Sequence, residues 1–381
     1  MTERRPAEAF PPGDFIRDEL DERGWTQTDL AEILGRPLNV VNEIIAGKKS
    51  ITPETAKGLA NAFGTTPDVW LNLESAYQLW KVGDTGGDVA LRAKLYSKAP
   101  VREMIKRRWI EPSNSPEVLQ QRILDFFEIT SLDEEPRAWS HAARKAGDYS
   151  AITATQLAWL FRARQLAPAI LAKPYTRAKM DELIPLLRSM LADAEDVRRV
   201  PTILAEHGVR CLIVEPLPAT RIDGACFWLD EHSPVVVLSM RYDRIDAFWF
   251  TLMHELAHVQ AGDGLDNNEP LDTDLIGPES KQDKPEYEKR ADDAATEALV
   301  APSALDDFIG RVKPLYSKQK IRNFARVQGV HPGIVVGQLQ HRDEIGYSHS
   351  REMLVKVREV AVRSTLTDGW GQPLEVPSGG R

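Results

Sequence analysis

The sequence predicts an α+β protein that is mostly helical, and three observations carry this prediction. Apolar residues recur at helical spacing over most of the first 200 residues. Short β-branched and apolar runs follow between residues 208 and 239. A long apolar segment comes next and contains the motif HExxH, from His254 to His258. We therefore expect a five-helix N-terminal domain, a helical middle region, and a domain with a small β-sheet beside the HExxH helix.

Composition limits the classes of protein that remain possible. The chain has 381 residues, enough for two or three domains, and its net charge of −9 excludes a polycation that coats nucleic acid. Its two cysteines argue against a disulfide framework and favour a reducing environment. The first residues lack the apolar region of a signal peptide, and no apolar run approaches the roughly 20 residues of a membrane span. We expect a cytoplasmic protein that does not contact a membrane.

Changes in composition along the chain predict its organisation. Val82 to Val89 contains adjacent glycines and no periodicity, which is typical of a hinge. The predicted segments are a disordered arm over 1–11, a helix-turn-helix domain over 12–81, a linker over 82–89, a helical middle region over 90–200, the domain with the HExxH helix over 201–345, and a C-terminal helix with a disordered tail over 346–381.

Thr26 to Ser50 has the form of a helix-turn-helix. Thr26 is a good N-cap with Asp29 as its capping partner, and Gly35 suits the tight turn. The second helix is expected to enter the major groove, where Asn side chains can pair with adenine edges. The expected DNA contacts are Gln27, Thr28, Leu38, Asn39, Asn42, Glu43, Lys48 and Lys49.

The charge of this segment argues for a second interpretation. Pro12 to Lys81 holds seven Lys or Arg and eleven Asp or Glu residues, a net charge of −4, whereas DNA-binding domains are usually basic. The alternative is a five-helix domain that binds protein or dimerises without touching DNA.

The β-branched runs predict a strand within Gly208 to Leu217 and a hairpin over Gly224 to Ser239. The hairpin strand from Val235 to Leu238 could pair with an extended peptide by strand addition. The acidic stretch from Gly262 to Pro285 is either a solvated insertion or a flap over the active site.

The HExxH motif predicts a zinc site, because residues four apart lie on one face of a helix. His254 and His258 can therefore reach one metal ion, with Glu255 beside it as a general base. A third ligand is needed, and Glu288 on a helix from Glu286 to Val300 can supply it. Asp292, on the same face, could accept the second ring N–H of a ligand histidine. Buried core histidines and a folded but inactive zinc site are the alternatives.

Two resemblances follow from these motifs. TQTDLAEILG with IIAGKKSITPETAKGLANAFGTTPDVWLNLESAYQL, within residues 12–80, is similar to XRE-type helix-turn-helix domains of the HigA-like antitoxin subgroup. VVVLSMRYDRIDAFWFTLMHELAH and EKRADDAATEALVAP, within residues 200–345, resemble the ImmA/IrrE zinc metallopeptidases. The second likeness implies a zincin-like fold and a peptidase that cuts repressors. It also implies that His254, His258 and Glu288 bind Zn²⁺ and that Glu255 is the general base. Ala294 departs from the usual Phe, and the recognition positions contain no Arg.

Together these features predict a DNA-binding transcriptional regulator whose zinc-dependent protease domain hydrolyses a regulatory protein partner. We expect it to bind a double-stranded operator as a homodimer. The alternative is a HigA-like antitoxin or repressor whose metallopeptidase fold is inactive and serves to bind a toxin, another partner or a signal.

Overall fold

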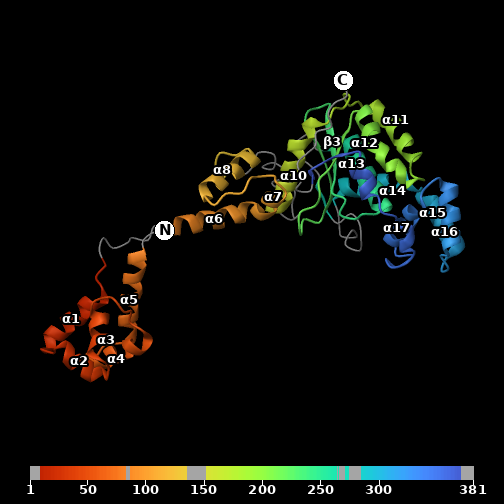
Figure 1. Ribbon diagram of the computed structural model, residues 1–381. Coiled ribbons are helices and arrows are strands. Elements are labelled where there is room, and N and C mark those ends of the chain that lie inside the picture. Colours follow the sequence, from red (N-terminus) through yellow and green to blue (C-terminus); the bar gives the residue numbers. More distant parts are fainter. Residues whose placement is uncertain are drawn as a thin grey trace. The chain divides into compact units, whose positions relative to one another are not determined.

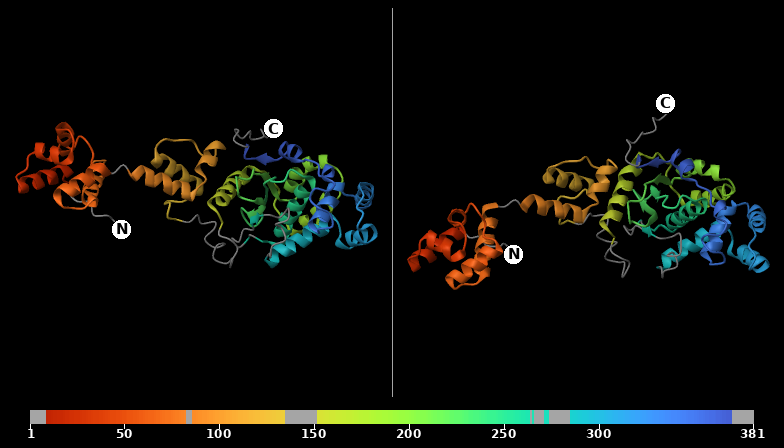
Figure 2. Two further views of the ribbon diagram at one scale, coloured as in Figure 1. Left: turned by 90° about the horizontal axis from the view of Figure 1, so that it is seen from below. Right: turned by 60° about the horizontal axis from the view of Figure 1, so that its bottom comes forward.

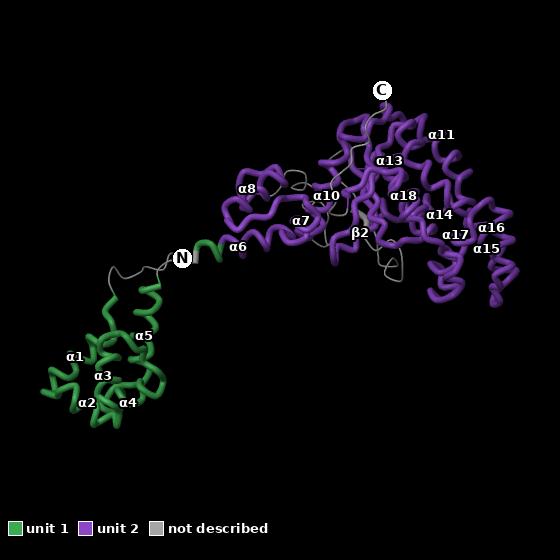
Figure 3. The backbone as a smooth tube through the Cα atoms, viewed as in Figure 1, with its two compact units in different colours: residues 1–90 green, residues 91–381 purple. Residues whose placement is uncertain are grey.

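The computed structural model describes residues 9–82, 86–134, 152–263, 265, 271–273 and 285–369. The chain divides into two compact units, residues 1–90 and residues 91–381 (Figure 3). Both are mostly helical, and the second contains a small mixed sheet, which confirms the fold class at that level. Among the described helices, none combines the length and the apolar character needed to cross a membrane.

The first unit contains the five helices expected from the sequence. They are α1 (Pro12–Arg23), α2 (Gln27–Leu34), α3 (Leu38–Ile45), α4 (Pro53–Phe63) and α5 (Pro67–Val82). Buried apolar side chains from all five form one core, including Ile16, Leu30, Val41, Leu59 and Trp70. Burial of these faces, rather than helix propensity, holds such short helices together.

Local capping fixes where α2 begins and ends. The Thr26 hydroxyl accepts a hydrogen bond from the Asp29 N–H, and the Asp29 carboxylate accepts one from the Thr26 N–H at 2.7 Å. Gly35 then ends the helix in the left-handed region, with φ of 61°, where glycine has no Cβ to clash. The predicted capping box and tight turn are both present.

The second unit is built around a five-stranded sheet in the order β4-β2-β3-β1-β5. Its strands are β1 (Arg210–Ile213), β2 (Ile222–Trp228), β3 (Pro234–Leu238), β4 (Leu271–Thr273) and β5 (Leu366–Thr367). β2 and β3 form the expected antiparallel hairpin, and β1 runs parallel to β3. The prediction that an extended peptide pairs with Val235–Leu238 is wrong, because β1 and β2 already bond to both sides of β3.

Helices cover both faces of this sheet (Figures 1 and 2). The first group is α6 (Gly86–Lys98), α7 (Val101–Lys106), α8 (Pro116–Phe127) and α10 (Ala154–Leu166). The second group is α11 (Arg177–Arg188), α12 (Val200–Glu206), α13 (Ile245–Ala261), α14 (Glu286–Leu299), α15 (Pro302–Val312), α16 (Lys318–Gln328), α17 (Pro332–His341) and α18 (Arg358–Val362). Short 3-10 turns are η1 (Ala167–Ala169), η2 (Ala194–Arg199) and η4 (Arg351–Met353).

Alternate residues of the strands enter two separate cores. Val235 and Val237 of β3 pack with the first helix group, whereas Val236 and Leu238 pack with the second. The helical middle region therefore shares a core with the sheet and lies in the same compact unit as the HExxH helix.

The structure also differs from the sequence prediction at the segment boundaries. α6 begins at Gly86, inside the predicted linker, and Leu366–Thr367 pairs with β1 inside the predicted C-terminal tail. The arm over residues 1–8, most of the acidic stretch and the tail beyond residue 369 lie outside the described residues.

Candidate metal centre and DNA interface

The HExxH segment lies on α13, which is buried between the sheet and α14. Apolar side chains on several faces of this helix are buried, as expected for a helix enclosed on most sides. Gly262 ends it in the left-handed region with φ of 76° and lets the chain turn immediately. α14 packs along α13, which brings residues about 30 positions apart into contact.

Three electron-pair donors meet between these two helices. Nε2 of His254 lies 3.1 Å from Nε2 of His258 and 3.2 Å from Oε2 of Glu288. Nε2 of His258 lies 3.7 Å from the same carboxylate oxygen. All three residues are buried, with Glu288 only 4% exposed. The structure thus brings together the three ligands expected from the sequence.

A carboxylate contacts the other nitrogen of each imidazole. Oδ1 of Asp292 lies 3.0 Å from Nδ1 of His254, the position predicted for it. Oδ2 of Asp263 lies 2.8 Å from Nδ1 of His258 and also accepts a hydrogen bond from Arg290 at 2.6 Å. A carboxylate beside each Nδ1 favours the tautomer that carries its proton there, which leaves each Nε2 to present its lone pair to the centre.

The sequence analysis did not predict a role for Asp263 beside His258. The Trp228 indole donates to the main-chain oxygen of Asp263 at 2.9 Å and anchors the residue directly after the helix cap. Burial raises the pKa of the Asp263 carboxyl, but hydrogen bonds from His258 and Arg290 outweigh it and leave the pKa lowered. The sequence signal that could have indicated Asp263 is an acidic residue directly after Gly262, the glycine that ends α13.

The donor set fits a zinc ion. Two imidazole nitrogens and one carboxylate oxygen are the protein ligands of many catalytic zinc sites. Ligands about 2.0–2.1 Å from zinc in tetrahedral geometry lie about 3.3 Å from one another. The three distances here bracket that value. Three lone pairs held this close in a buried space repel one another, and a cation between them removes that repulsion.

Glu255 faces the sheet. It is fully buried, and a methyl group added at Gly224 of β2 would overlap its carboxylate. Gly224 therefore leaves the space that the Glu255 carboxylate fills. Within the motif, His254 and His258 face α14 while Glu255 lies against β2.

All eight residues expected to contact DNA are exposed in the first unit. Gln27 and Thr28 begin α2, and α3 carries the next four on the face opposite its buried side. That buried side consists of Val41, Ile44 and Ile45. The exposed residues are Gln27, Thr28, Leu38, Asn39, Asn42, Glu43, Lys48 and Lys49.

Comparison with known proteins finds relatives of the N-terminal unit. A helix-turn-helix family model matches residues 16–70. The HTH-type transcriptional regulator YddM of Escherichia coli is 34% identical over 68 residues, which are 18% of this chain and 72% of that protein. Antitoxin HigA-1 of Vibrio cholerae is 39% identical over 80 residues, which are 21% of this chain and 72% of that protein.

Solved structures match the same part of the chain. A HigA-family addiction module antidote protein from Coxiella burnetii is 38% identical, with a TM-score of 0.20, and the match covers 21% of this chain and 88% of that one. By its N-terminal unit, the chain belongs to the helix-turn-helix family of DNA-binding regulators and antitoxins that includes the HigA proteins.

Proposed function

We propose that this chain is a DNA-binding transcriptional regulator with a zinc-dependent peptidase domain that cuts a regulatory protein partner. The observation that carries the peptidase proposal is the convergence of His254, His258 and Glu288, with a carboxylate on the far nitrogen of each ring. If Asp263 and Asp292 only satisfied two buried imidazoles, nothing would require Nε2 of both histidines and the Glu288 carboxylate to converge on one point.

The residues have distinct roles in this proposal. His254, His258 and Glu288 hold zinc, which when bound polarises a peptide carbonyl and acidifies water. Glu255 takes the proton from the attacking water and returns it to the leaving amine. Asp292 and Asp263 keep each imidazole in the tautomer that leaves Nε2 unprotonated.

The test of the peptidase proposal is Glu255→Gln. The variant should bind zinc as the natural protein does, because Glu255 is not a ligand, and should lose cleavage of casein or of a copurified partner. The matched control is Glu286→Gln, at an exposed position at the start of α14. Cleavage that persists in Glu255→Gln would refute the proposal, and so would the absence of stoichiometric zinc from the natural protein.

The DNA-binding role rests on α3 and its exposed polar side chains. In this proposal Asn39 and Asn42 read base edges, while Lys48 and Lys49 approach phosphates. We expect a homodimer that covers two half-sites about one helical turn apart. The footprint of the protein on its operator should vanish in the double variant Asn39→Ala with Asn42→Ala. It should persist in Asn61→Ala, a control at an exposed position on α4. A footprint unaffected by the double change would favour a domain that only dimerises or binds protein.

A second candidate function follows from the likeness to antitoxin HigA-1. In that case the chain is an antitoxin or repressor, and the HExxH domain binds a partner or a signal without cutting. A partner that copurifies intact with both the natural protein and Glu255→Gln would support this candidate. A partner trapped intact only by Glu255→Gln would support the peptidase.

A further inference from the structure

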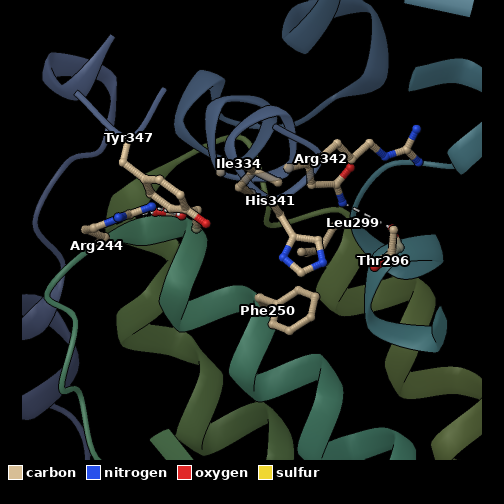
Figure 4. A pocket seen from close by; sticks show the side chains of 11 residues that line it. Arg244, Phe250, Thr296, Leu299, Ile334, His341, Arg342 and Tyr347 are labelled. Carbon is tan, nitrogen blue, oxygen red and sulfur yellow. Dashed lines mark hydrogen bonds and ion pairs between the residues drawn. The ribbon is translucent and has the colours of Figure 1, made fainter. Parts of the chain in front are cut away.

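A cavity lies along α13, one helical turn before the metal-binding histidines. About 550 Å³ of space that no protein atom fills, open solvent included, lies here between α13, α14, α17 and the segment that follows α17. Figure 4 shows Phe250 and His341 at its centre, with Arg244 and Tyr347 on one side and Thr296 and Arg342 on the other.

The walls of the cavity are mostly apolar, and its charges are already compensated. Leu299 and Ile334 line it beside the Phe250 ring. The guanidinium of Arg244 pairs with Asp246, with Nε 3.0 Å from Oδ1, and that of Arg342 pairs with Asp306. Because both arginines at the rim have carboxylate partners, the cavity favours an uncharged occupant over an anion.

One polar atom in the wall lacks a partner. Gln338 is 8% exposed, and its Nε2 donates to the main-chain oxygen of Thr296 at 3.3 Å. That bond orients the amide, and within the described residues Oε1 of Gln338 is buried with no hydrogen-bond partner. A buried acceptor left unsatisfied is costly, so an occupant whose donor reaches Oε1 after a small turn of the Gln338 amide would be favoured here.

The cavity is next to the metal centre but separate from it. The Phe250 ring centroid lies 6.2 Å from that of His254 and 6.5 Å from that of His341. Phe250 and His254 are four residues apart on one face of α13, so an occupant stacked on Phe250 lies beside the metal site without using its ligands.

We propose that this cavity binds an uncharged heteroaromatic ring that stacks on Phe250 and donates an N–H to Oε1 of Gln338. The ring can belong to a free small molecule or to a tryptophan side chain of a peptide. Either occupant would contact the start of the helix that carries the metal-binding histidines.

The experiment measures binding of indole and benzofuran to the full chain by calorimetry. Benzofuran has nearly the same shape but no N–H. The natural protein should bind indole about five- to tenfold more tightly, the factor expected for one hydrogen bond to a buried acceptor. Gln338→Met should remove this preference while benzofuran binding stays within about twofold. Gln319→Met, at an exposed amide on α16, is the matched control and should keep the preference.

A second variant and a peptide probe complete the design. Phe250→Leu should weaken both compounds at least about fivefold by removing the stacking surface. N-acetyltryptophanamide that binds more tightly than indole would assign the site to a peptide side chain, and weaker binding would assign it to a free ring compound. The absence of saturable binding by all three probes, or an indole preference that survives Gln338→Met, would overturn the proposal. Circular dichroism and zinc content check that each variant is folded.

Discussion

Replacing Asp263 by Asn should weaken zinc binding through His258. In the structure, Oδ2 of Asp263 lies 2.8 Å from Nδ1 of His258, and the carboxylate charge makes the His258 Nε2 a better electron-pair donor. Asn keeps an acceptor oxygen but loses the charge. Changes of this kind typically cost 10- to 100-fold in metal affinity, or about 1.4–2.7 kcal/mol. We expect a loss toward the lower end of this range, because Arg290 already donates a hydrogen bond to the same oxygen and offsets part of its charge.

The assay is a zinc titration in competition with a chelating dye, performed on the full chain. Asp292→Asn should give a loss of the same order through His254, whereas Asp293→Asn, at an exposed position beside it on α14, should leave the affinity unchanged. If Asp263→Asn retains zinc within twofold of the natural affinity, the reasoning that assigns Asp263 an orienting role is refuted.

Three further predictions concern Gly224 and the first unit. Gly224→Ala should displace the Glu255 carboxylate and reduce peptidase activity at least about tenfold with zinc retained; full activity would contradict the contact with β2. Leu30→Ala removes a fully buried side chain and should lower the unfolding free energy of unit 1 by about 2–5 kcal/mol, measured by hydrogen exchange of the α2 amides. Hydrogen bonds from the Thr26 backbone and hydroxyl hold the pKa of Asp29 below its ordinary value of 3.8. The stability that this carboxylate contributes is therefore complete above about pH 3.8 and is lost as the pH falls through the lowered pKa. Thermal unfolding of unit 1 should show a steeper loss below that pH in the natural protein than in Asp29→Asn, and equal slopes would show that the capping box does not contribute.

The sequence predicted those parts of the site that depend on one helix at a time. A four-residue spacing places His254 and His258 on one face of α13, and it places Glu288 and Asp292 on one face of α14. The four expected DNA-contact residues that lie on α3 are exposed for the same reason, since the period of the helix separates them from its buried side. Their roles in binding DNA stay predictions.

The parts of the site and of the sheet that could not be predicted depend on contacts between segments that are far apart in the sequence. Asp263 reaches His258 only because the chain turns at Gly262 and Trp228 anchors it, and neither effect has a periodic signal. The continuous apolar run along β3 indicates a strand buried on both faces but not which strands bond to its edges. β3 is central because β1, more than 20 residues earlier in the chain, pairs with one of its edges. The pairing of β1 with β3 requires the whole unit to assemble.

The pairing of β5 with β1 has a consequence for synthesis of the protein. β1 can acquire this neighbour only after Leu366 has been made, roughly 280 residues after the last residue of unit 1. At 5–20 residues per second this delay is about 14–56 s. Unit 1 has its own core and can fold on the ribosome during that time, whereas the sheet beside the candidate metal centre stays incomplete. A nascent chain therefore has a folded helix-turn-helix well before the sheet of unit 2 is complete.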